Sequence, residues 1–335
     1  MRLMQFQAAL LACLLSCLPP VNAEPQIVIK LSHTAPSATP RGLAAERFRE
    51  QVEARTNGNV KIEVYPDGTL YPEAQELEAL TNGSLQMTII STTRFGTIGI
   101  PDFEVLDLPF ITPSTRAFHA LAYGPLGREM LKSLDDKGLT GLAIWDGGFR
   151  VITSNRPFQT IADLKGLKIR TNQSKVLQLY RQSLGMRPQW VPLKDLPQAL
   201  QNGSIDAVET IISNVWTENL MPQQKYALML RDTHQAYVLA ANKKFWDSLP
   251  ADTRNALDDA IRASTTYADA LAEVENRVGA NKIRNSGKME VVAPAPEQIQ
   301  ALKRVAIPVY KATAERLGRA RIEAVLKLSG QSMPE

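Results

Sequence analysis

Strand and helix patterns alternate in the first third of the chain, and this alternation is the feature that most constrains its fold. Residues 26–32 (QIVIKLS) and residues 60–65 (VKIEVY) alternate apolar and polar side chains, which predicts two β-strands. Between them Thr39 is a candidate N-cap, and apolar residues then recur at helical spacing. A second helix at residues 73–80 and an apolar strand at residues 85–90 complete a β-α-β-α-β order. This order predicts an α/β fold, with a mainly parallel sheet and helices on both faces.

The same plan recurs in the second half of the chain. Residues 79–85 (ALTNGSL) and residues 199–205 (ALQNGSI) both end a helix on Asn-Gly, a typical left-handed C-cap, before an aliphatic residue leads into a strand. Upstream, the Val-Lys-Ile of residues 60–62 is echoed by the Leu-Lys-Ile of residues 167–169. We therefore expect two similar lobes with a cleft between them and long helices packed outside. Further predicted elements are strands at 139–145, 150–154, 207–212, 238–242 and 291–292, and helices at 114–123, 127–137, 195–202, 252–283 and from 296 to 328.

The N-terminus has the pattern of an export signal. Arg2 supplies a positive charge, and residues 8–18 form an apolar stretch that is too short to span a bilayer. Small residues at the recognition positions before Glu24 predict cleavage after Ala23. We expect residues 1–23 to be a signal peptide and the mature protein to be soluble in the periplasm.

The only two cysteines of the chain, Cys13 and Cys17, both lie inside this predicted signal. The mature chain would then have no thiol for a disulfide, for catalysis or for a metal site. A lipoprotein acylated on Cys17 is the alternative, but the LLSC sequence of residues 14–17 matches that signal only loosely. We therefore expect no lipid anchor.

Charge and motifs exclude several classes of function. The formal net charge of +4 is spread along the chain, without the basic runs and interleaved aromatic residues that bind nucleic acid. Phosphate-binding, dinucleotide-binding, metalloprotease and nucleophile-elbow motifs do not occur. The three histidines, His33, His119 and His234, are scattered, so we expect no metal and no cofactor. An exported α/β hydrolase remains the alternative from another class, because a Ser-His-Asp set that uses His33 or His234 need not be contiguous.

Arginines follow three predicted strands: Arg94, Arg150 and Arg170. Open α/β sheets receive their ligands at the carboxyl ends of strands, and a guanidinium group matches a carboxylate in bidentate fashion. Two cations that face one cleft are costly to desolvate without an anion between them. The residues alone therefore leave two interpretations open, a carboxylate site and ordinary surface arginines.

Dense motifs extend over most of the chain from about residue 29 to about residue 317, and their order and spacing resemble those of one family. The motifs are AERF at 45–48, VYPDGTL at 64–70, DLPF at 107–110, WDGGFR at 145–150, DLKGLKIR at 163–170, ALQNG at 199–203 and NKKFWDSLP at 242–250. In these residues the chain resembles the DctP-type substrate-binding proteins of tripartite ATP-independent periplasmic (TRAP) transporters.

The resemblance implies a two-lobed periplasmic binding protein with a hinge and an inter-lobe cleft. Such a protein closes on an organic acid and delivers it to the small and large membrane subunits of a transporter. We expect lobe I to comprise residues 24–149 with about 238–275, and lobe II to comprise residues 150–237 with about 276–335. Delivery to a signalling receptor instead of a transporter remains open, and the long helical stretch at 252–283 is compatible with a homodimer.

The resemblance also assigns ligand contacts. Arg170 corresponds to the arginine that pairs with the ligand carboxylate, Arg150 to a second arginine near it, and Glu73 to a side chain on its polar groups. The further expected contacts are Ser91, Arg94, Gln173, Leu193, Glu209, Thr210, Asn214, Trp216 and His33, with Trp190 as a possible wall of the site.

Two positions depart from the family pattern and bear on the ligand. Thr210 stands where the pocket asparagine is usual, and Ser91 stands where sialic-acid binders resemble one another in carrying a glutamate. A sialic acid is therefore not expected. Because several polar candidates surround Arg170, we expect a hydroxylated sugar acid, such as a uronate or an aldonate, ahead of a C4-dicarboxylate.

Overall fold

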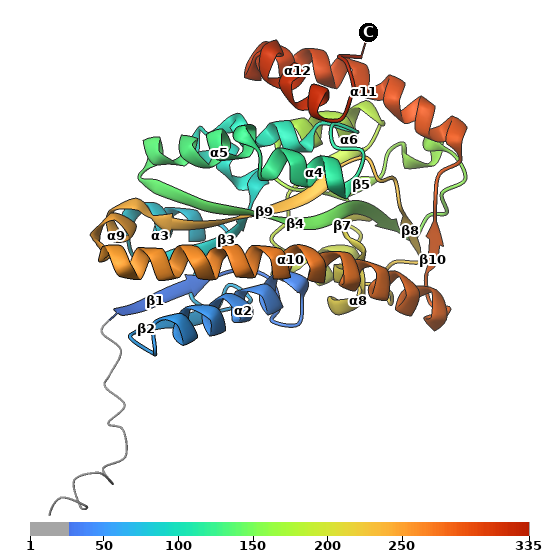
Figure 1. The fold of residues 1–335 in the computed structure, drawn as a ribbon. Coiled ribbons are helices and arrows are strands. Elements are labelled where there is room, and N and C mark those ends of the chain that lie inside the picture. Colours follow the sequence, from blue (N-terminus) through green and yellow to red (C-terminus); the bar gives the residue numbers. More distant parts are fainter. Residues whose placement is uncertain (1–26, 335) are drawn as a thin grey trace, which may run out of the picture.

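The computed structural model describes residues 27–334 (Figure 1). The predicted signal peptide, its cleavage site and both cysteines lie outside the described residues. No helix within residues 27–334 combines the length and the apolar character that a membrane crossing needs.

Lobe I, as we name the part around the first three strands, has the predicted β-α-β-α-β order. Its elements are β1 (Ile27–Ser32), α2 (Pro40–Arg55), β2 (Val60–Tyr65), α3 (Glu76–Asn82) and β3 (Met87–Ser91). The strands are parallel in the order β2-β1-β3. Helix α2 begins where the sequence predicts, because the Thr39 side chain accepts a hydrogen bond from the backbone N–H of Gly42.

Lobe II repeats this plan, as the sequence repeat predicts. Its elements are β5 (Lys168–Arg170), α6 (Lys175–Ser183), β6 (Arg187–Gln189), α7 (Leu196–Gln201) and β7 (Ala207–Ile211). The strands are again parallel, in the order β6-β5-β7. The two Asn-Gly dipeptides lie at equivalent helix ends. Gly83 and Gly203 both have left-handed backbones, with φ of 86° and 71°.

Two long antiparallel strands join the lobes and form the hinge. β4 (Leu139–Ser154) and β9 (His234–Asn242) pair with each other, β9 also pairs with β3, and β4 also pairs with β7. Both cross the middle of the molecule in Figure 1. The sequence predicts a break at residues 146–150, but the structure has a continuous strand with a bulge between Asp146 and Gly148.

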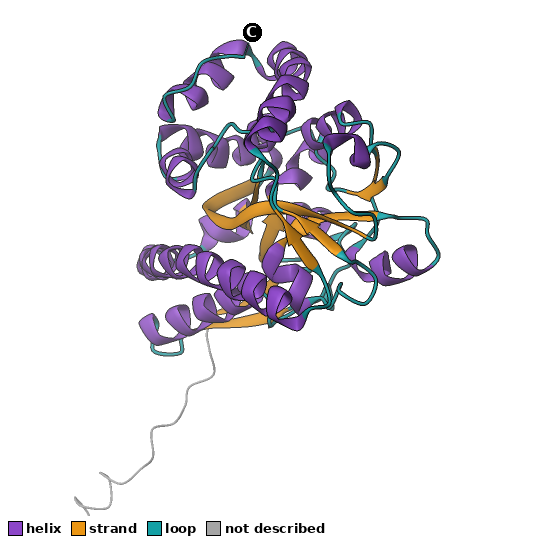
Figure 2. Ribbon diagram, turned by 90° about the vertical axis from the view of Figure 1, so that its right-hand side faces the viewer, coloured by secondary structure: helices purple, strands orange, loops and turns teal. Residues whose placement is uncertain are grey.

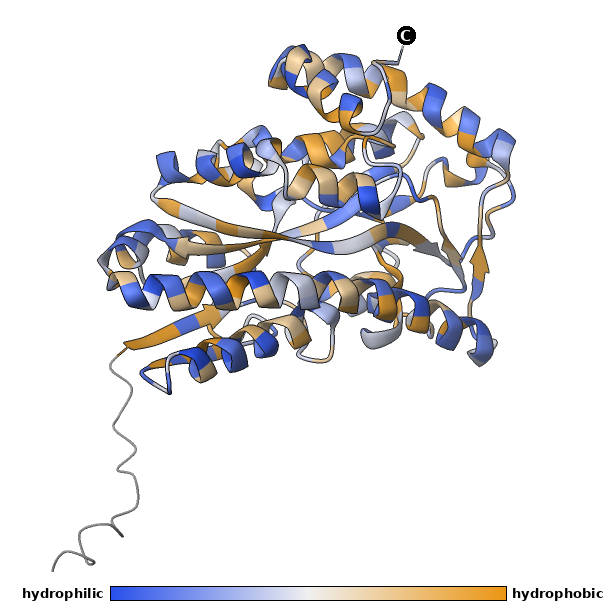
Figure 3. Cartoon of the chain, in the orientation of Figure 1, coloured by the Kyte–Doolittle hydropathy of each residue, from blue (hydrophilic) through white to orange (hydrophobic). Residues whose placement is uncertain are grey.

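The remaining elements cover this sheet on both faces (Figure 2). They are α4 (Thr115–Ala122), α5 (Pro125–Lys132), α8 (Ile212–Thr217), α9 (Lys243–Ser248), α10 (Ala251–Ser286), α11 (Pro296–Leu317) and α12 (Arg319–Leu328), with short 3-10 helices that include η3 (Pro101–Asp107). The strands β8 (Tyr226–Leu228) and β10 (Glu290–Val292) extend the sheet itself, because β8 pairs with β4 and β10 pairs with β8. In Figure 3 the helices α10 and α11 alternate hydrophilic and hydrophobic bands, as expected for helices with one buried side.

Helix α10 braces the hinge from one side of the sheet. Its 36 residues extend roughly 54 Å at 1.5 Å per residue, and it packs on α2 of lobe I and on α8 of lobe II. The Asp269 carboxylate accepts a hydrogen bond of 3.0 Å from the backbone N–H of Asp146, and the Asn276 amide donates one of 2.9 Å to the Gly147 carbonyl. The predicted homodimer through this helix stays a prediction.

The apolar core is divided on the α10 face and continuous on the other face. Around α10, one cluster belongs to lobe I and a separate one to lobe II. On the opposite face a single cluster joins residues of both lobes, including Phe95, Ile152 and Leu302. The lobe boundaries expected from the sequence stay a prediction.

Gly148 supports a first prediction, because it lies in the hinge with φ of 93°. A Cβ there would lie 2.3 Å from the Asn276 side-chain nitrogen, which holds the hinge carbonyl of Gly147. We expect Gly148→Ala to lower the free energy of unfolding by about 2–3 kcal/mol, measured by urea denaturation. Gly287→Ala is the matched control, because Gly287 also has a left-handed backbone but would meet nothing within 4 Å. Equal losses in the two variants would contradict the role of the Asn276 contact.

Candidate ligand-binding site

A cavity of about 60 Å³ lies between the two lobes. Three predicted contact residues reach it from the carboxyl ends of strands: Ser91 ends β3, Arg170 ends β5, and Thr210 is next to last in β7. The parallel strands of both lobes therefore present their carboxyl ends to one site, as expected for open α/β sheets. The predicted contact residues that line the cavity are Glu73, Ser91, Arg94, Arg170, Leu193, Glu209, Thr210 and Asn214.

The structure adds lining residues that the sequence did not single out. They are Thr34, Arg41, Glu76, Ile90, Asn172, Ile211, Glu218, Gln235 and Tyr237. Arg41 lies in the first turn of α2, and Glu218 is the C-cap of α8, so neither follows a strand directly. The sequence held one signal that Arg41 lies near the site. Arg41 directly follows the helix start at Thr39-Pro40, and that start comes soon after the first strand.

Arg170 presents a positive charge that no carboxylate neutralises directly. Its side chain is 7% exposed, its Nε donates to the Val191 carbonyl at 3.1 Å, and its Nη1 donates to the Asn172 side chain at 3.4 Å. Within residues 27–334 no carboxylate oxygen lies within 4.0 Å of its guanidinium nitrogens. The guanidinium group is thus held in place by neutral oxygens and remains available to an anion.

Arg41 and Arg94 have the same character on the lobe I side. Arg41 donates to the Ile89 carbonyl at 3.4 Å and to the Thr34 hydroxyl at 3.3 Å, and its guanidinium carbon lies 4.6 Å from the centre of the Tyr237 ring. Arg94 donates to the Glu73 carbonyl at 2.9 Å and to the Gln173 side chain. In the described part of the chain neither arginine forms an ion pair within 4.0 Å.

The acidic residues of the cavity wall are in different protonation states. Burial alone would raise the pKa of Glu209, but the guanidinium groups of Arg181 and Arg150 hold that pKa below its ordinary value. Burial raises the pKa of Glu76 to about 7, although the Ser32 hydroxyl donates to its Oε1 at 2.8 Å. Burial likewise raises the pKa of Glu218 to about 7. Two of these carboxyl groups are thus partly protonated near neutral pH.

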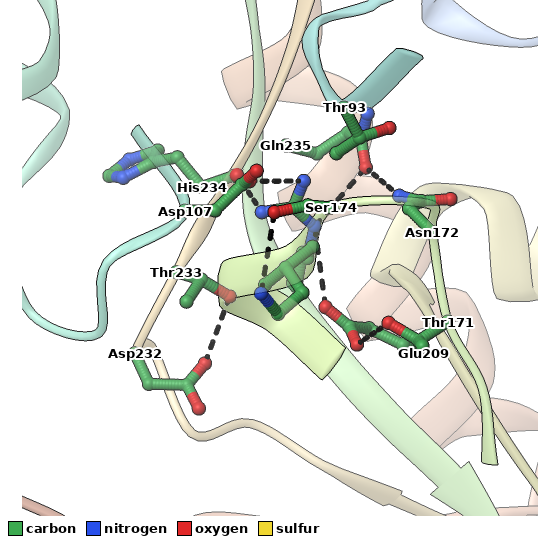
Figure 4. Close-up of polar contacts among 12 residues, drawn as sticks. Thr93, Asp107, Thr171, Asn172, Ser174, Glu209, Asp232, Thr233, His234 and Gln235 are labelled. Carbon is green, nitrogen blue, oxygen red and sulfur yellow. Dashed lines mark hydrogen bonds and ion pairs between the residues drawn. The ribbon is translucent and has the colours of Figure 1, made fainter. Parts of the chain in front are cut away.

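A buried ion network lies behind this wall, and Figure 4 shows three of its members, Thr171, Glu209 and Asp232. Arg181 is completely buried; its Nε is 3.1 Å from Glu209 Oε2 and its Nη1 is 2.8 Å from Asp232 Oδ2. The Thr171 hydroxyl donates to the same Glu209 oxygen at 2.6 Å. Glu209 Oε2 therefore accepts hydrogen bonds from two donors, and Arg150 Nε forms an ion pair at 3.4 Å with the other carboxylate oxygen, Oε1.

Arg150 takes a position that differs from the sequence prediction. Its side chain is 1% exposed and does not line the cavity. Its Nη2 is 3.1 Å from Asp107 Oδ1, its Nε donates to Gln235 Oε1 at 3.2 Å, and its Nη1 donates to the His234 carbonyl. The buried carboxylates of Asp107 and Glu209, from distant segments, pair with the Arg150 guanidinium group. In this structure Arg150 therefore orients Gln235 and Glu209, which do line the cavity.

Three other predicted contacts also lie outside the cavity lining. Gln173 accepts a hydrogen bond from Arg94, and Trp216 faces Lys282, whose nitrogen is 5.5 Å from the ring centre. His33 is completely buried, and burial lowers its pKa to about 3. Trp190 lies under the Arg94 guanidinium at 5.9 Å.

His33 and His234, the histidines of the hydrolase alternative, form no ion pair with an acid among the residues that the structure describes. Neither ring nitrogen of His33 has a hydrogen-bond partner there. His234 contacts the Thr112 hydroxyl at 2.9 Å and packs between the rings of Phe118 and Phe149. Residues 27–334 also hold no group of three His, Cys, Asp or Glu side chains placed to bind a metal ion.

A second cavity of about 270 Å³ adjoins the first and shares Thr34, Glu73 and Leu193 with it. Residues 67–74 of lobe I and 192–195 of lobe II line it. The two loops touch where the Leu193 backbone N–H donates to Glu73 Oε2 at 3.4 Å. The two lobes therefore meet over the site, as required of a cleft that closes.

Comparison with known proteins gives concordant results. The family model "Bacterial extracellular solute-binding protein, family 7" (DctP) matches residues 31–317. The chain is 41% identical to the C4-dicarboxylate-binding periplasmic protein DctP of Rhodobacter capsulatus over 306 residues, which cover 91% of this chain and 92% of that protein.

Solved structures agree with this result. A TRAP periplasmic solute-binding protein from Shewanella oneidensis with bound succinate superposes with a TM-score of 0.87 at 29% identity, covering 91% of this chain and 99% of that one. The sugar acid binding protein from Advenella mimigardefordensis in complex with galactonate gives a TM-score of 0.87 at 26% identity, covering 92% and 99%.

Proposed function

Since this chain belongs to the bacterial extracellular solute-binding proteins of family 7, the DctP family of TRAP transport, we propose that it captures an organic acid anion in the periplasm and delivers it to TRAP membrane subunits. Family membership confirms the prediction of a solute-binding protein and not an enzyme. The periplasmic location is supported by the family and by the predicted signal at residues 1–23.

One observation carries the proposal: Arg41, Arg94 and Arg170 line one cavity, and no carboxylate of the described residues pairs with any of them. Burying a guanidinium group without a counter-ion is costly, so such a cavity favours an anionic ligand. A carboxylate accepts two parallel hydrogen bonds from a guanidinium group, and closing the lobes removes competing water. Arg170 is the proposed carboxylate partner on the lobe II side.

A C4-dicarboxylate is the ligand class that these observations favour. Arg170 faces the cavity from lobe II, and Arg41 and Arg94 face it from lobe I, so a dianion satisfies both sides. The enclosed volume of about 60 Å³ holds roughly four to six water molecules, which favours a compact acid. The relative in Rhodobacter capsulatus and the succinate complex support the same class. This order reverses the expectation from the sequence, which placed sugar acids first.

A hydroxylated sugar acid is the second candidate, and the polar wall favours it. Ser91, Thr210, Asn214 and Gln235 line the cavity and can bind ligand hydroxyl groups. The galactonate complex of a similar protein supports this candidate. The adjoining cavity of about 270 Å³ offers room for a longer acid.

A thermal-shift screen tests the proposal and separates the two classes. A ligand that binds only the folded protein raises its unfolding temperature, by more as its concentration exceeds Kd. We expect succinate and L-malate to raise the unfolding temperature, D-galactonate to raise it less, and butyrate, a monoanion of similar length, to leave it almost unchanged. A shift with D-galactonate alone would establish the second candidate, and no shift with any organic acid would refute the proposed function.

Arg41→Ala is expected to weaken succinate binding by about 10- to 150-fold, because a charge-assisted hydrogen bond contributes about 1.5–3 kcal/mol. Butyrate has no second carboxylate, so its weak affinity is expected to change little. Isothermal titration calorimetry measures both affinities. Arg47→Ala on the same helix is the control, because Arg47 is exposed and pairs with Glu50. Equal losses for the two acids would show that Arg41 does not read the second carboxylate.

A further inference from the structure

We infer that Glu218 takes up a proton when the cavity binds a carboxylate ligand and then donates a hydrogen bond to that ligand. This inference rests on the proposed function, because it requires an organic acid in the cavity. It assigns to Glu218 a role as a neutral hydrogen-bond donor in ligand recognition.

The surroundings of Glu218 carry the inference. The residue is the C-cap of α8 and lines the cavity, and its Oε1 is buried without a hydrogen-bond partner among the described residues. The charged and titratable groups that face it come from four other segments: Arg170 on β5, Arg41 on α2, Asp67 after β2 and Tyr237 on β9. A buried oxygen without a partner in a ligand cavity is one that a ligand can satisfy.

In the ligand-free protein Arg170 and Arg41 favour the charged form of Glu218 from beyond ion-pair distance. Arg170 and Arg41 have no ion pair within 4.0 Å in the described part of the chain, and both attract negative charge on Glu218. Burial opposes this attraction and raises the pKa of Glu218 to about 7. Near neutral pH the group is therefore divided between its charged and neutral forms.

A bound acid changes this balance. Its carboxylate occupies the same guanidinium groups and brings a like charge into the site, and two carboxyl groups that share one site cannot both stay ionised. A free C4 acid holds its protons only in the acidic range, so the proton goes to Glu218. A protein molecule whose Glu218 is ionised before it binds the dianion takes up one proton from solution. The resulting Glu218 O–H then donates a hydrogen bond to a ligand carboxylate oxygen.

The sign of the pH dependence follows from this exchange. The complex holds a proton that the free protein loses as the pH rises through about 7, so affinity falls with rising pH. With a pKa of about 7 in the free protein, succinate binding is expected to weaken roughly fivefold from pH 7 to pH 8 and almost tenfold per further unit.

Isothermal titration calorimetry with succinate tests the inference between pH 6.5 and pH 8.5. Running each titration in phosphate and in Tris, which differ in ionisation enthalpy, gives the number of protons taken up. We expect about half a proton at pH 7, rising toward one at pH 8. This measurement on the unaltered protein decides the question even if a variant fails to fold.

Variants identify the group. Glu218→Gln keeps the shape and a donor N–H but cannot titrate, so we expect an affinity near that of the unaltered protein at pH 6.5, no pH slope and no proton uptake. His119→Gln is expected to retain the slope, although the Asp146 carboxylate, 3.3 Å from the His119 Nε2, raises the pKa of His119.

Three results would overturn the inference: succinate binding without proton uptake, a pH slope that persists in Glu218→Gln, or an affinity loss above tenfold in that variant at pH 6.5. The last result would mean that Glu218 acts as a carboxylate. Failure of the proposed function is distinguishable, because then no organic acid binds at any pH.

Discussion

We expect Arg170→Ala to weaken binding of the organic acid by at least about 30-fold. Removing one partner of a buried, hydrogen-bonded charge pair costs about 2–5 kcal/mol, because the ligand carboxylate is left desolvated without its cation. Arg170 is 7% exposed, and within residues 27–334 its side chain donates only to neutral oxygens, so no other contact compensates. Isothermal titration calorimetry with succinate measures the loss.

Two controls accompany this variant. Arg187→Ala removes an exposed arginine from β6, the strand beside β5, and is expected to bind like the unaltered protein. Arg170→Lys keeps the charge without the planar fork and is expected to fall between the two. Affinity within threefold of the unaltered protein in a folded Arg170→Ala variant would exclude Arg170 as the carboxylate partner.

The largest effect on stability is expected at Arg181, which does not itself line the cavity. Arg181→Met removes the cation that lies 3.1 Å from Glu209 and 2.8 Å from Asp232, both completely or almost completely buried. Breaking a buried ion pair on one side is strongly destabilising, by about 3–5 kcal/mol, because uncompensated charge stays buried. Chemical denaturation measures the change in the free energy of unfolding.

The matched control is Arg319→Ala, in which an exposed i,i+4 pair with Glu323 is lost. Exposed pairs of this kind contribute roughly 0.3–0.5 kcal/mol, so the two arginines should differ by several kcal/mol. A loss below 1 kcal/mol in Arg181→Met would mean that Glu209 and Asp232 find protons or other donors when the cation is removed.

Local patterns predicted most of the fold. The Asn-Gly dipeptides at residues 82–83 and 202–203 lie at equivalent helix ends. They were predictable because a left-handed helix cap depends only on neighbouring residues. The strand β6 (Arg187–Gln189) had no such signal, since it is three residues long, largely exposed and contains Pro188. The Gly-Gly at residues 147–148 indicated a break in β4, whereas pairing with β9 keeps the strand continuous through a bulge.

The site was predictable where residues follow strands, and less so elsewhere. Arg170 was selected because it lies near a strand end, where open α/β sheets bind ligands, whereas Ser91 and Thr210 came from the family resemblance. Arg41 lies in the first turn of α2 and Glu218 caps α8, where charged residues are ordinarily solvated, so neither was selected from the sequence. The helix start soon after the first strand was a signal for Arg41, and Glu218 had no comparable signal. The position of Arg150 depends on buried acids 43 and 59 residues away, Asp107 and Glu209, which only the fold brings together.

The most direct test of the central claim is a crystal structure of the protein with succinate. We expect one ligand carboxylate at hydrogen-bond distance, about 2.7–2.9 Å, from the Arg170 guanidinium group and the other on the lobe I side at Arg41. Succinate bound with neither carboxylate on Arg170, or bound outside this cavity, would contradict the account.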